Sequence, residues 1–290
     1  MDLADRLKQY ALLMRLHRPI GALLLGWPAL WALWFAAGGA PDGKILAVFL
    51  FGILLTRSAG CVINDYADRD FDPHVARTRD RPIARGRVAP REALVLFVLV
   101  SLTAFGLVLL LNPLTVALSV IGAALTVTYP FLKRHTHLPQ FYLGLAFGWA
   151  IPMAFAAVLG TVPPLAWVLF AADIFWCVAF DTEYAMVDRA DDLRIGVKST
   201  AILFGDYDRA AVGAAHAATL GLLVVAGLMA KLGVLYYVGL TIAAGIALYQ
   251  QRLIRDRRPE RCWRAFLNNN WFGAAVFAGV ALSYLVENRA

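Results

Sequence analysis

Long apolar stretches alternate with short polar ones along almost the whole chain. From these stretches we predict nine membrane-spanning helices, at residues 20–37, 46–66, 91–111, 114–132, 139–158, 164–184, 210–230, 232–250 and 267–286. Each is close to the roughly 20 residues that a helix needs to cross the hydrocarbon core of a bilayer. The breaks at Asn112-Pro113, at 161–164 and at 231–233 leave room only for tight turns. The pattern therefore predicts an all-α, polytopic membrane protein.

Composition agrees with one membrane domain that covers residues 1–290. Hydrophobic residues make up 60% of the chain and charged residues 16%, against about 45–50% and about 25% in soluble domains. Many apolar stretches follow the first one, so we do not expect the first to be a cleaved signal sequence. Residues 1–19 contain acids and no serine, which argues against a transit peptide. We expect a bacterial inner membrane protein.

Basic residues collect on one side of this topology. They concentrate in residues 1–19 and in the loops after the second, fourth, sixth and eighth spans. Of the 27 Lys and Arg, only Lys44, Lys231 and Arg289 lie on the other side, and Arg57 lies within a span. Because Lys and Arg mark the cytoplasmic side of short loops, we predict a cytoplasmic N-terminus and cytoplasmic loops at 67–90 and 185–209. Topology and attraction to membrane lipids then explain the net charge of +7, and nucleic-acid binding is not expected.

Two acidic clusters interrupt the apolar pattern, each at the predicted cytoplasmic end of an even-numbered span. Polar residues spaced three or four apart share one face of a helix. Such rows are formed by Asn64, Asp68 and Asp72 in the first cluster, and by Asp181, Tyr184, Asp188 and Asp192 in the second. Their matched spacing favours an internal duplication of four plus four helices, followed by a ninth. The acids that point elsewhere are expected to be solvated, and these are Asp65, Asp70, Glu183 and Asp191.

Carboxylates on adjacent turns repel one another, and a divalent cation relieves this repulsion. Mg²⁺ binds one or two carboxylates and fills its shell with water and phosphate oxygens. We therefore expect the two rows to face each other and to hold Mg²⁺ against a diphosphate. Basic residues follow each cluster, and arginine forks fit phosphate oxygens. Arg77, Arg81 and Lys198 are the best candidates for that contact.

Three further cations have two interpretations each. Arg57 lies inside a span, seven residues before Asn64, and an ionisable group within a membrane helix is a functional candidate by default. It would also fit a structural ion pair with Asp181. Lys133 and Arg134 end the fourth span. They are candidates for contact with the substrate, but a cation near a helix C-terminus is favourable in any case.

These residues resemble the UbiA superfamily of intramembrane prenyltransferases. Its two motifs, N-D-x-x-D-x-x-x-D and D-x-x-Y-A-x-x-D-x-x-x-D, are both met, from Asn64 to Asp72 and from Asp181 to Asp192. The stretches YPFLKRHTHLPQ and DTEYAMVDRADDLRIGVKSTAILFG are similar to the branch that prenylates 4-hydroxybenzoate in ubiquinone biosynthesis. The last two helices match less distinctively.

The resemblance implies a helical bundle around a central cavity that opens to lipid. It implies catalysis by Asp68, Asp188 and Asp192. Our own hypothesis for the mechanism is that Asp188 polarises the acceptor hydroxyl. It implies that Mg²⁺ is held by Asn64, Asp68, Asp72, Asp188 and Asp192. It implies that polyprenyl diphosphate and 4-hydroxybenzoate are bound by Arg57, Arg77, Lys133, Arg134, Asp181, Tyr184 and Lys198.

Alternatives from other classes make different demands on the sequence. A relative with another acceptor, such as homogentisate, dihydroxynaphthoate, haem or a chlorophyllide, would carry the same motifs. A cation-coupled transporter also uses intramembrane acids, but near the bilayer midplane, whereas these acids lie at the ends of spans. A phosphatidyl-group transferase carries one compact Asp-rich motif on a smaller bundle, which this sequence does not show.

Overall fold

The computed structural model describes residues 2–75, 77–132 and 134–287, and these ranges are helical without strands. Nine helical segments within them are long and apolar enough to cross a membrane, which confirms the predicted number. The segments are α2 (Ile20–Ala37), α3 (Gly43–Ala67), α4 (Pro90–Val108), α5 (Pro113–Leu132), α6 with α7 (Pro139–Gly148, Ala150–Leu159), α8 (Pro164–Ile195), α9 with α10 (Thr200–Phe204, Asp208–Met229), α11 (Val234–Leu253) and α12 (Pro259–Glu287).

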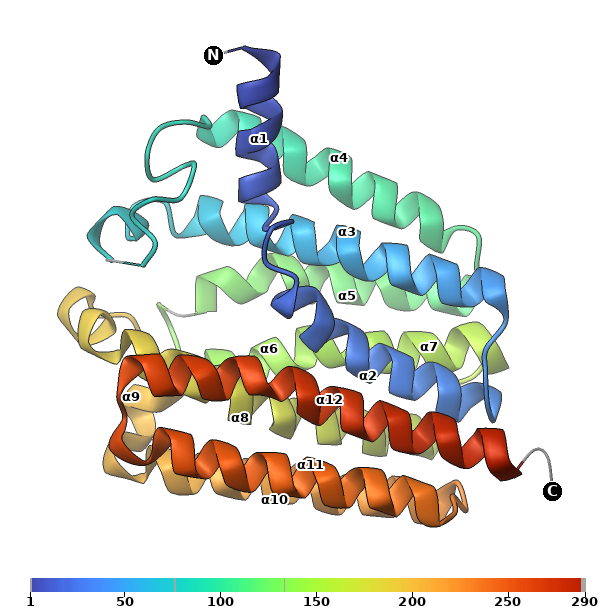
Figure 1. Cartoon of the computed structure of the whole chain (residues 1–290). Coiled ribbons are helices and arrows are strands. Elements are labelled where there is room, and N and C mark those ends of the chain that lie inside the picture. The colour runs from blue at the N-terminus through green and yellow to red at the C-terminus, as the bar shows by residue number, and fades with distance from the viewer. Residues whose placement is uncertain (1, 76, 133, 288–290) are drawn as a thin grey trace.

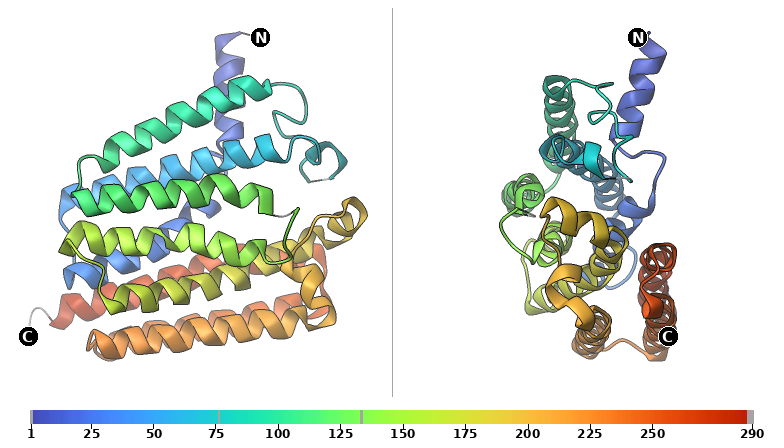
Figure 2. Two further views of the ribbon diagram at one scale, coloured as in Figure 1. Left: turned by 180° about the vertical axis from the view of Figure 1, so that it is seen from behind. Right: turned by 90° about the vertical axis from the view of Figure 1, so that its left-hand side faces the viewer.

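The spanning helices lie side by side in one bundle (Figure 1). The loop between α3 and α4 and the short helix α9 lie at one end, which we call the acidic end because both acidic clusters are there. A further helix, α1 (Leu3–Leu13), crosses the ends of the spans instead of running parallel to them (Figures 1 and 2). The cytoplasmic position of the N-terminus and the four-plus-four duplication stay predictions.

Helices α2 and α8 form the centre of the bundle, and α4 and α5 its most exposed part. Helix α8 packs against α6, α10 and α12, while α2 packs against α7 and α12. Their shared core contains large aromatic side chains that are fully buried, including Trp31, Trp176, Phe180 and Phe272. The central helices therefore have fixed neighbours on several sides, whereas α4 and α5 present apolar side chains outward.

Polar groups at the predicted turns hold the spans in place. The Asn112 side chain accepts hydrogen bonds from the backbone N–H and the hydroxyl of Thr115, and it donates to the carbonyl of Ala156. These bonds tie the turn between α4 and α5 to α7. At the end of α7, Gly160 adopts a left-handed conformation with φ of +70°, which glycine tolerates best.

The fifth predicted span, 139–158, is interrupted at Trp149. Pro152 explains the interruption, because its ring removes the N–H that would bond the carbonyl of Gly148 and clashes with that carbonyl. The buried carboxyl group of Asp173 lies against this break, since a Cβ on Gly148 would be 2.8 Å from its Oδ2 atom.

The expected loop at 185–209 is wrong over its first half. Helix α8 continues to Ile195 and ends at Gly196, where φ is +73°. The charged residues of this stretch stay helical because they have partners on other segments, such as Asp188 with Arg77 and Arg189 with Asp208. The second acidic row is therefore carried by a continuous helix.

Three consecutive asparagines of α12 each hydrogen-bond to a different helix. Asn269 is fully buried and bonds two side chains of α8 at 2.8 and 2.9 Å. The partners are Gln250 of α11 for Asn268, Trp176 and Glu183 of α8 for Asn269, and Trp27 of α2 for Asn270. Because Trp176 and Glu183 lie on the side of α8 away from its acidic row, these bonds hold the row turned toward the opposite side.

Candidate active site

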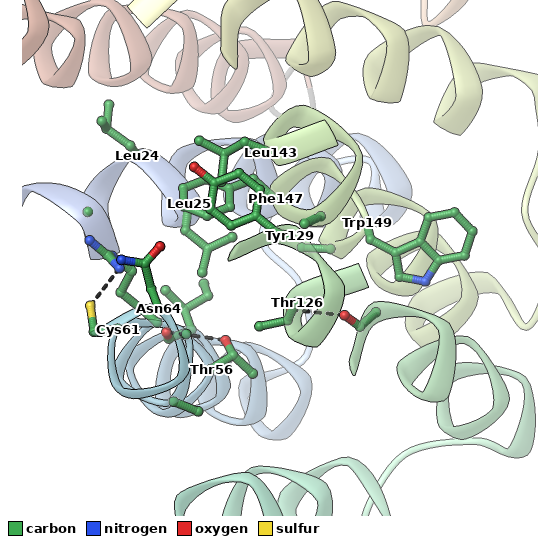
Figure 3. A pocket seen from close by; sticks show the side chains of 18 of the residues that line it. Leu24, Leu25, Thr56, Cys61, Asn64, Thr126, Tyr129, Leu143, Phe147 and Trp149 are labelled. Atoms are coloured by element: carbon green, nitrogen blue, oxygen red, sulfur yellow. Dashed lines mark hydrogen bonds between the residues drawn. The ribbon is translucent and has the colours of Figure 1, made fainter. Parts of the chain in front are cut away.

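A pocket of about 440 Å³ is lined by helices α2 to α8 and by the start of α12. Its lining on α3 runs from Asp65 to Val48, a length of roughly 26 Å at 1.5 Å per residue. Apolar side chains such as Leu24, Leu143 and Phe147 line its interior (Figure 3), and the charged lining residues collect toward the acidic end. A pocket of this shape suits an amphiphile with an anionic head and a long apolar tail.

Both sequence motifs contribute to this pocket. From α3 and the loop after it come Arg57, Asn64 and Arg77, and from α8 come Asp181 and Tyr184. Arg57 and Asn64 are two turns apart and share a face of α3. The two motif segments thus border a common hollow, which the hypothesis of a shared metal and diphosphate site requires.

Arg77 joins the first loop to the second acidic row. Its Nε atom lies 3.0 Å from both carboxylate oxygens of Asp188, and its Nη2 atom also donates to Oδ2. The guanidinium carbon lies 4.7 Å from the centre of the Tyr184 ring. Although burial opposes it, the contacts with Tyr184 and Asp188 raise the pKa of Arg77 above its ordinary value, so the residue stays charged.

The expected helical row of Asn64, Asp68 and Asp72 is wrong at its last member. Helix α3 ends at Ala67, and the Asn64 amide donates to Asp68 Oδ2 at 3.2 Å. Asp72 lies instead on a short 3-10 helix (Asp72–His74), where it accepts bonds of 2.9 and 3.0 Å from Arg81. Because the chain leaves the helical path after Ala67, the Asp72 carboxylate can pair with the Arg81 guanidinium. Burial raises the pKa of Asp72 to about 6, although Arg81 acts against this.

Two acids that we expected to be solvated are buried. The Asp65 carboxylate, with 1% of its side chain exposed, accepts bonds of 2.8 and 2.9 Å from Arg15 and pairs with Arg81 at 3.0 Å. Glu183 is fully buried against Asn269. Their partners lie far away in the sequence, so the local pattern could not reveal them. Asp70 is exposed, as expected.

Other predicted residues lie outside the pocket lining. The Arg134 side chain donates to the carbonyl of Ala67 and covers the Phe71 ring, and Lys198 donates to the carbonyl of His135. Both side chains thus tie loops together. Asp68 and Asp188 hydrogen-bond to the pocket-lining residues Asn64 and Arg77, respectively. Asp192 lies one helical turn beyond Asp188 near the end of α8, and Lys133 falls outside the described residues. Substrate contact by this group stays a prediction.

Sequence reasoning missed several residues that line the pocket. The charge pattern explains Arg15 and Arg18 as topology markers, yet both line the charged part of the pocket together with Arg81. Trp263 and Phe266 also line it, because α12 begins at Pro259 rather than at 267. The aromatic pair stands three residues apart in an arginine-rich stretch, and that spacing was the available signal.

The oxygen donors at the acidic end suit Mg²⁺ that is also coordinated by a substrate phosphate. Within the described residues, no group of three or more His, Cys, Asp or Glu side chains is placed to hold a metal ion alone. The Asn64 amide and the carboxylates of Asp68 and Asp188 are hard oxygen ligands. Mg²⁺ is commonly bound by one or two carboxylates with water and substrate phosphate. The donor set thus fits an ion that arrives with a diphosphate.

The fold and the pocket define an all-helical integral membrane protein with a site for a long amphiphilic substrate. The model of the UbiA prenyltransferase family matches residues 25–281. The chain belongs to this family.

Named relatives and solved structures agree with this assignment. The chain is 62% identical to 4-hydroxybenzoate octaprenyltransferase of Alkalilimnicola ehrlichii, over 97% of this chain and 96% of that protein. It is 57% identical to the enzyme of the same name from Thiobacillus denitrificans, over 99% and 98%. A UbiA homologue from Aeropyrum pernix K1 superposes with a TM-score of 0.77 at 26% identity, over 92% of this chain and 98% of that one. A UbiA homologue from Archaeoglobus fulgidus, solved bound to GPP and Mg²⁺, superposes with a TM-score of 0.73 at 19% identity, over 94% and 99%.

Proposed function

We propose that this protein transfers a polyprenyl group from its diphosphate to the ring carbon ortho to the hydroxyl of 4-hydroxybenzoate. The reaction is Mg²⁺-dependent and belongs to ubiquinone biosynthesis, in a bacterial inner membrane with the acidic end toward the cytoplasm. The names of the close relatives support the acceptor and the reaction. The observation that carries the proposal is the pocket itself, which joins residues of both acidic motifs to a long apolar interior.

The diphosphate head binds at the acidic end in this proposal. Arg18, Arg77 and Arg81 line that part of the pocket, and arginine forks match phosphate oxygens in geometry and charge. Asn64, Asp68, Asp72, Asp188 and Asp192 would hold Mg²⁺, which when bound would supply positive charge next to the diphosphate leaving group. The prenyl tail occupies the apolar interior.

Arg57 is the proposed contact for the acceptor carboxylate. It lies deeper than Asn64 on α3 and lines the pocket. Within the described residues, its hydrogen bond goes to the Cys61 sulfur, and its buried Nε atom has no partner. A guanidinium charge inside a membrane helix is costly, and the carboxylate of an aromatic acceptor bound in the pocket would compensate it. The Arg134 side chain is engaged with Ala67 instead, which favours Arg57 over Arg134.

Departure of the diphosphate leaves an allylic cation, which the pocket is built to stabilise. The rings of Tyr129, Phe147, Tyr184 and Trp263 line the pocket, and aromatic faces attract positive charge. The acceptor carbon ortho to the hydroxyl then forms the new bond, and the ring proton leaves. Asp181 is the proposed proton acceptor because it is an acidic residue of α8 that lines the pocket. Asp188 polarises the hydroxyl.

The test uses purified protein in lipid vesicles with labelled 4-hydroxybenzoate, a polyprenyl diphosphate and Mg²⁺. Label should move into the lipid phase, and chelation of Mg²⁺ should stop the transfer. D68A and D192A, checked for folding, should each lose most of the rate. Unchanged rates and unchanged Mg²⁺ dependence in both variants would contradict the proposal. Homogentisate and dihydroxynaphthoate, supplied in parallel, should be prenylated more slowly.

A further inference from the structure

The guanidinium of Arg57 lies in a space left by a glycine of the neighbouring helix. A Cβ atom built on Gly21 of α2 would lie 2.1 Å from Arg57 Nε and 2.6 Å from its Cζ. Real Cβ atoms do not approach other atoms so closely, so any larger residue at this position must displace the guanidinium. The same side chain donates from Nη1 to Cys61, one turn further along α3, as the dashed line in Figure 3 marks.

Backbone requirements do not explain the glycine at position 21. Its φ is not in the positive range, and it lies inside the regular helix α2. The atoms nearest to its hypothetical Cβ are all side-chain atoms of Arg57. Gly26, on the same helix and also facing α3, provides a comparison, because a Cβ there would meet only Ile53 at ordinary contact distances of 3.9 and 4.0 Å.

Holding an arginine still has a physical purpose here. The side chain carries about 2 kcal/mol of rotamer entropy, and a flexible arginine inside a membrane protein would turn toward water or lipid headgroups. Gly21 and Cys61 border the guanidinium from two helices and keep it beside the pocket. Both residues line the same pocket as Arg57.

We propose that Gly21 and Cys61 are positioning residues that aim Arg57 at the carboxylate of the acceptor. This inference rests on the proposed function and refines it. The cradle selects planar aromatic acceptors that carry a carboxylate, over phenols that lack one. Diphosphate binding, which uses residues nearer the acidic end, does not depend on it.

The test compares G21A with the matched control G26A in purified, vesicle-reconstituted protein. For G21A, the Kd of labelled 4-hydroxybenzoate and its KM should rise about 10-fold to 100-fold, the range for losing a hydrogen bond to a charged group. The KM of the polyprenyl diphosphate should change less than about 2-fold. G26A should leave all of these constants unchanged. Equal losses in both variants, or equal rises in both KM values, would overturn the proposal.

Two further variants keep the test decisive if G21A folds poorly. C61A should raise the acceptor KM, and C61S, which retains a hydrogen-bond acceptor, should restore it. A double-mutant cycle on acceptor binding then examines Arg57 itself. In an R57A background, G21A should have no further effect because nothing is left to displace, and a full effect there would refute the cradle. If the wild type neither binds nor prenylates 4-hydroxybenzoate, the proposed function fails; if it does both while G21A matches it, only the cradle fails.

Discussion

Replacing Arg77 with alanine would separate the loop after α3 from the second acidic row. Three N–H···O contacts to Asp188 and the stacking on Tyr184 would be lost. Removing one partner of a fully buried ion pair costs about 3–5 kcal/mol. Here 28% of the Arg77 side chain and 13% of the Asp188 side chain are exposed, so we discount that range for screening. We expect a loss of stability of about 1–3 kcal/mol.

The same substitution should change two binding constants in opposite directions. Without Arg77, no guanidinium competes with a metal ion for the Asp188 carboxylate, so the affinity for Mn²⁺ or Mg²⁺ alone should rise. The affinity for a metal–diphosphate complex should fall about 10-fold to 100-fold, because a charge-assisted hydrogen bond to the phosphate is lost. R77K keeps the positive charge but lacks the two parallel N–H donors of arginine. Its affinities for the metal alone and for the metal–diphosphate complex should lie between those of the wild type and R77A.

Isothermal titration calorimetry with Mn²⁺, with and without a non-hydrolysable prenyl thiodiphosphate, measures both effects. Thermal unfolding in the same detergent checks that the variants are folded. If both affinities fall by the same factor in R77A, the substitution has damaged the site as a whole, and the assigned role of Arg77 is refuted.

Three other predictions follow from particular contacts. N269A should lower the free energy of unfolding by about 1–4 kcal/mol, since it leaves the buried side chains of Trp176 and Glu183 without their hydrogen bonds to Asn269. E183Q should have a smaller effect because it keeps the hydrogen bond to Asn269. Unfolding in mixed detergent measures both effects. The folded-state pKa of Asp72, about 6, exceeds its ordinary value. This group therefore favours folding at low pH and loses that contribution as the pH rises to about 6. A stability titration of metal-free protein should lose this component in D72N. R134A should leave the acceptor KM within about 2-fold, while R57A should raise it at least as much as G21A does; equal effects of R57A and R134A would contradict the assignment.

Much of the architecture follows from local patterns in the sequence. The number of spans follows from the apolar stretches that are long enough to cross a bilayer, and the part of the chain that the structure describes contains all nine. Asn64, Asp181 and Tyr184, which the motif spacing singled out, line one pocket, while their roles in binding stay predictions. Segment ends were less predictable. The charged stretch up to Ile195 is helical because Asp188 and its neighbours find partners elsewhere in the chain.

The remaining features depend on contacts between distant residues. The residues near Asp65 in the sequence do not indicate that Arg15, fifty residues earlier, donates hydrogen bonds to its carboxylate. The burial of Glu183 depends in the same way on Asn269, and the closeness of Gly21 to Arg57 depends on how α2 packs on α3. Without relatives to compare, a sequence gives no signal for such pairs, because each partner has an ordinary local explanation.

The central claim is that Asp68, directly after α3, and Asp188 on α8 share one metal ion with one prenyl diphosphate. Mn²⁺ can replace Mg²⁺ as a paramagnetic probe, and pulsed electron–nuclear double resonance then detects phosphorus next to the metal. With a prenyl thiodiphosphate bound, the wild type should show a phosphorus coupling, and D68A and D188A should each lose it. A metal that couples to phosphorus equally well without either carboxylate, or that never couples to phosphorus, would contradict the account.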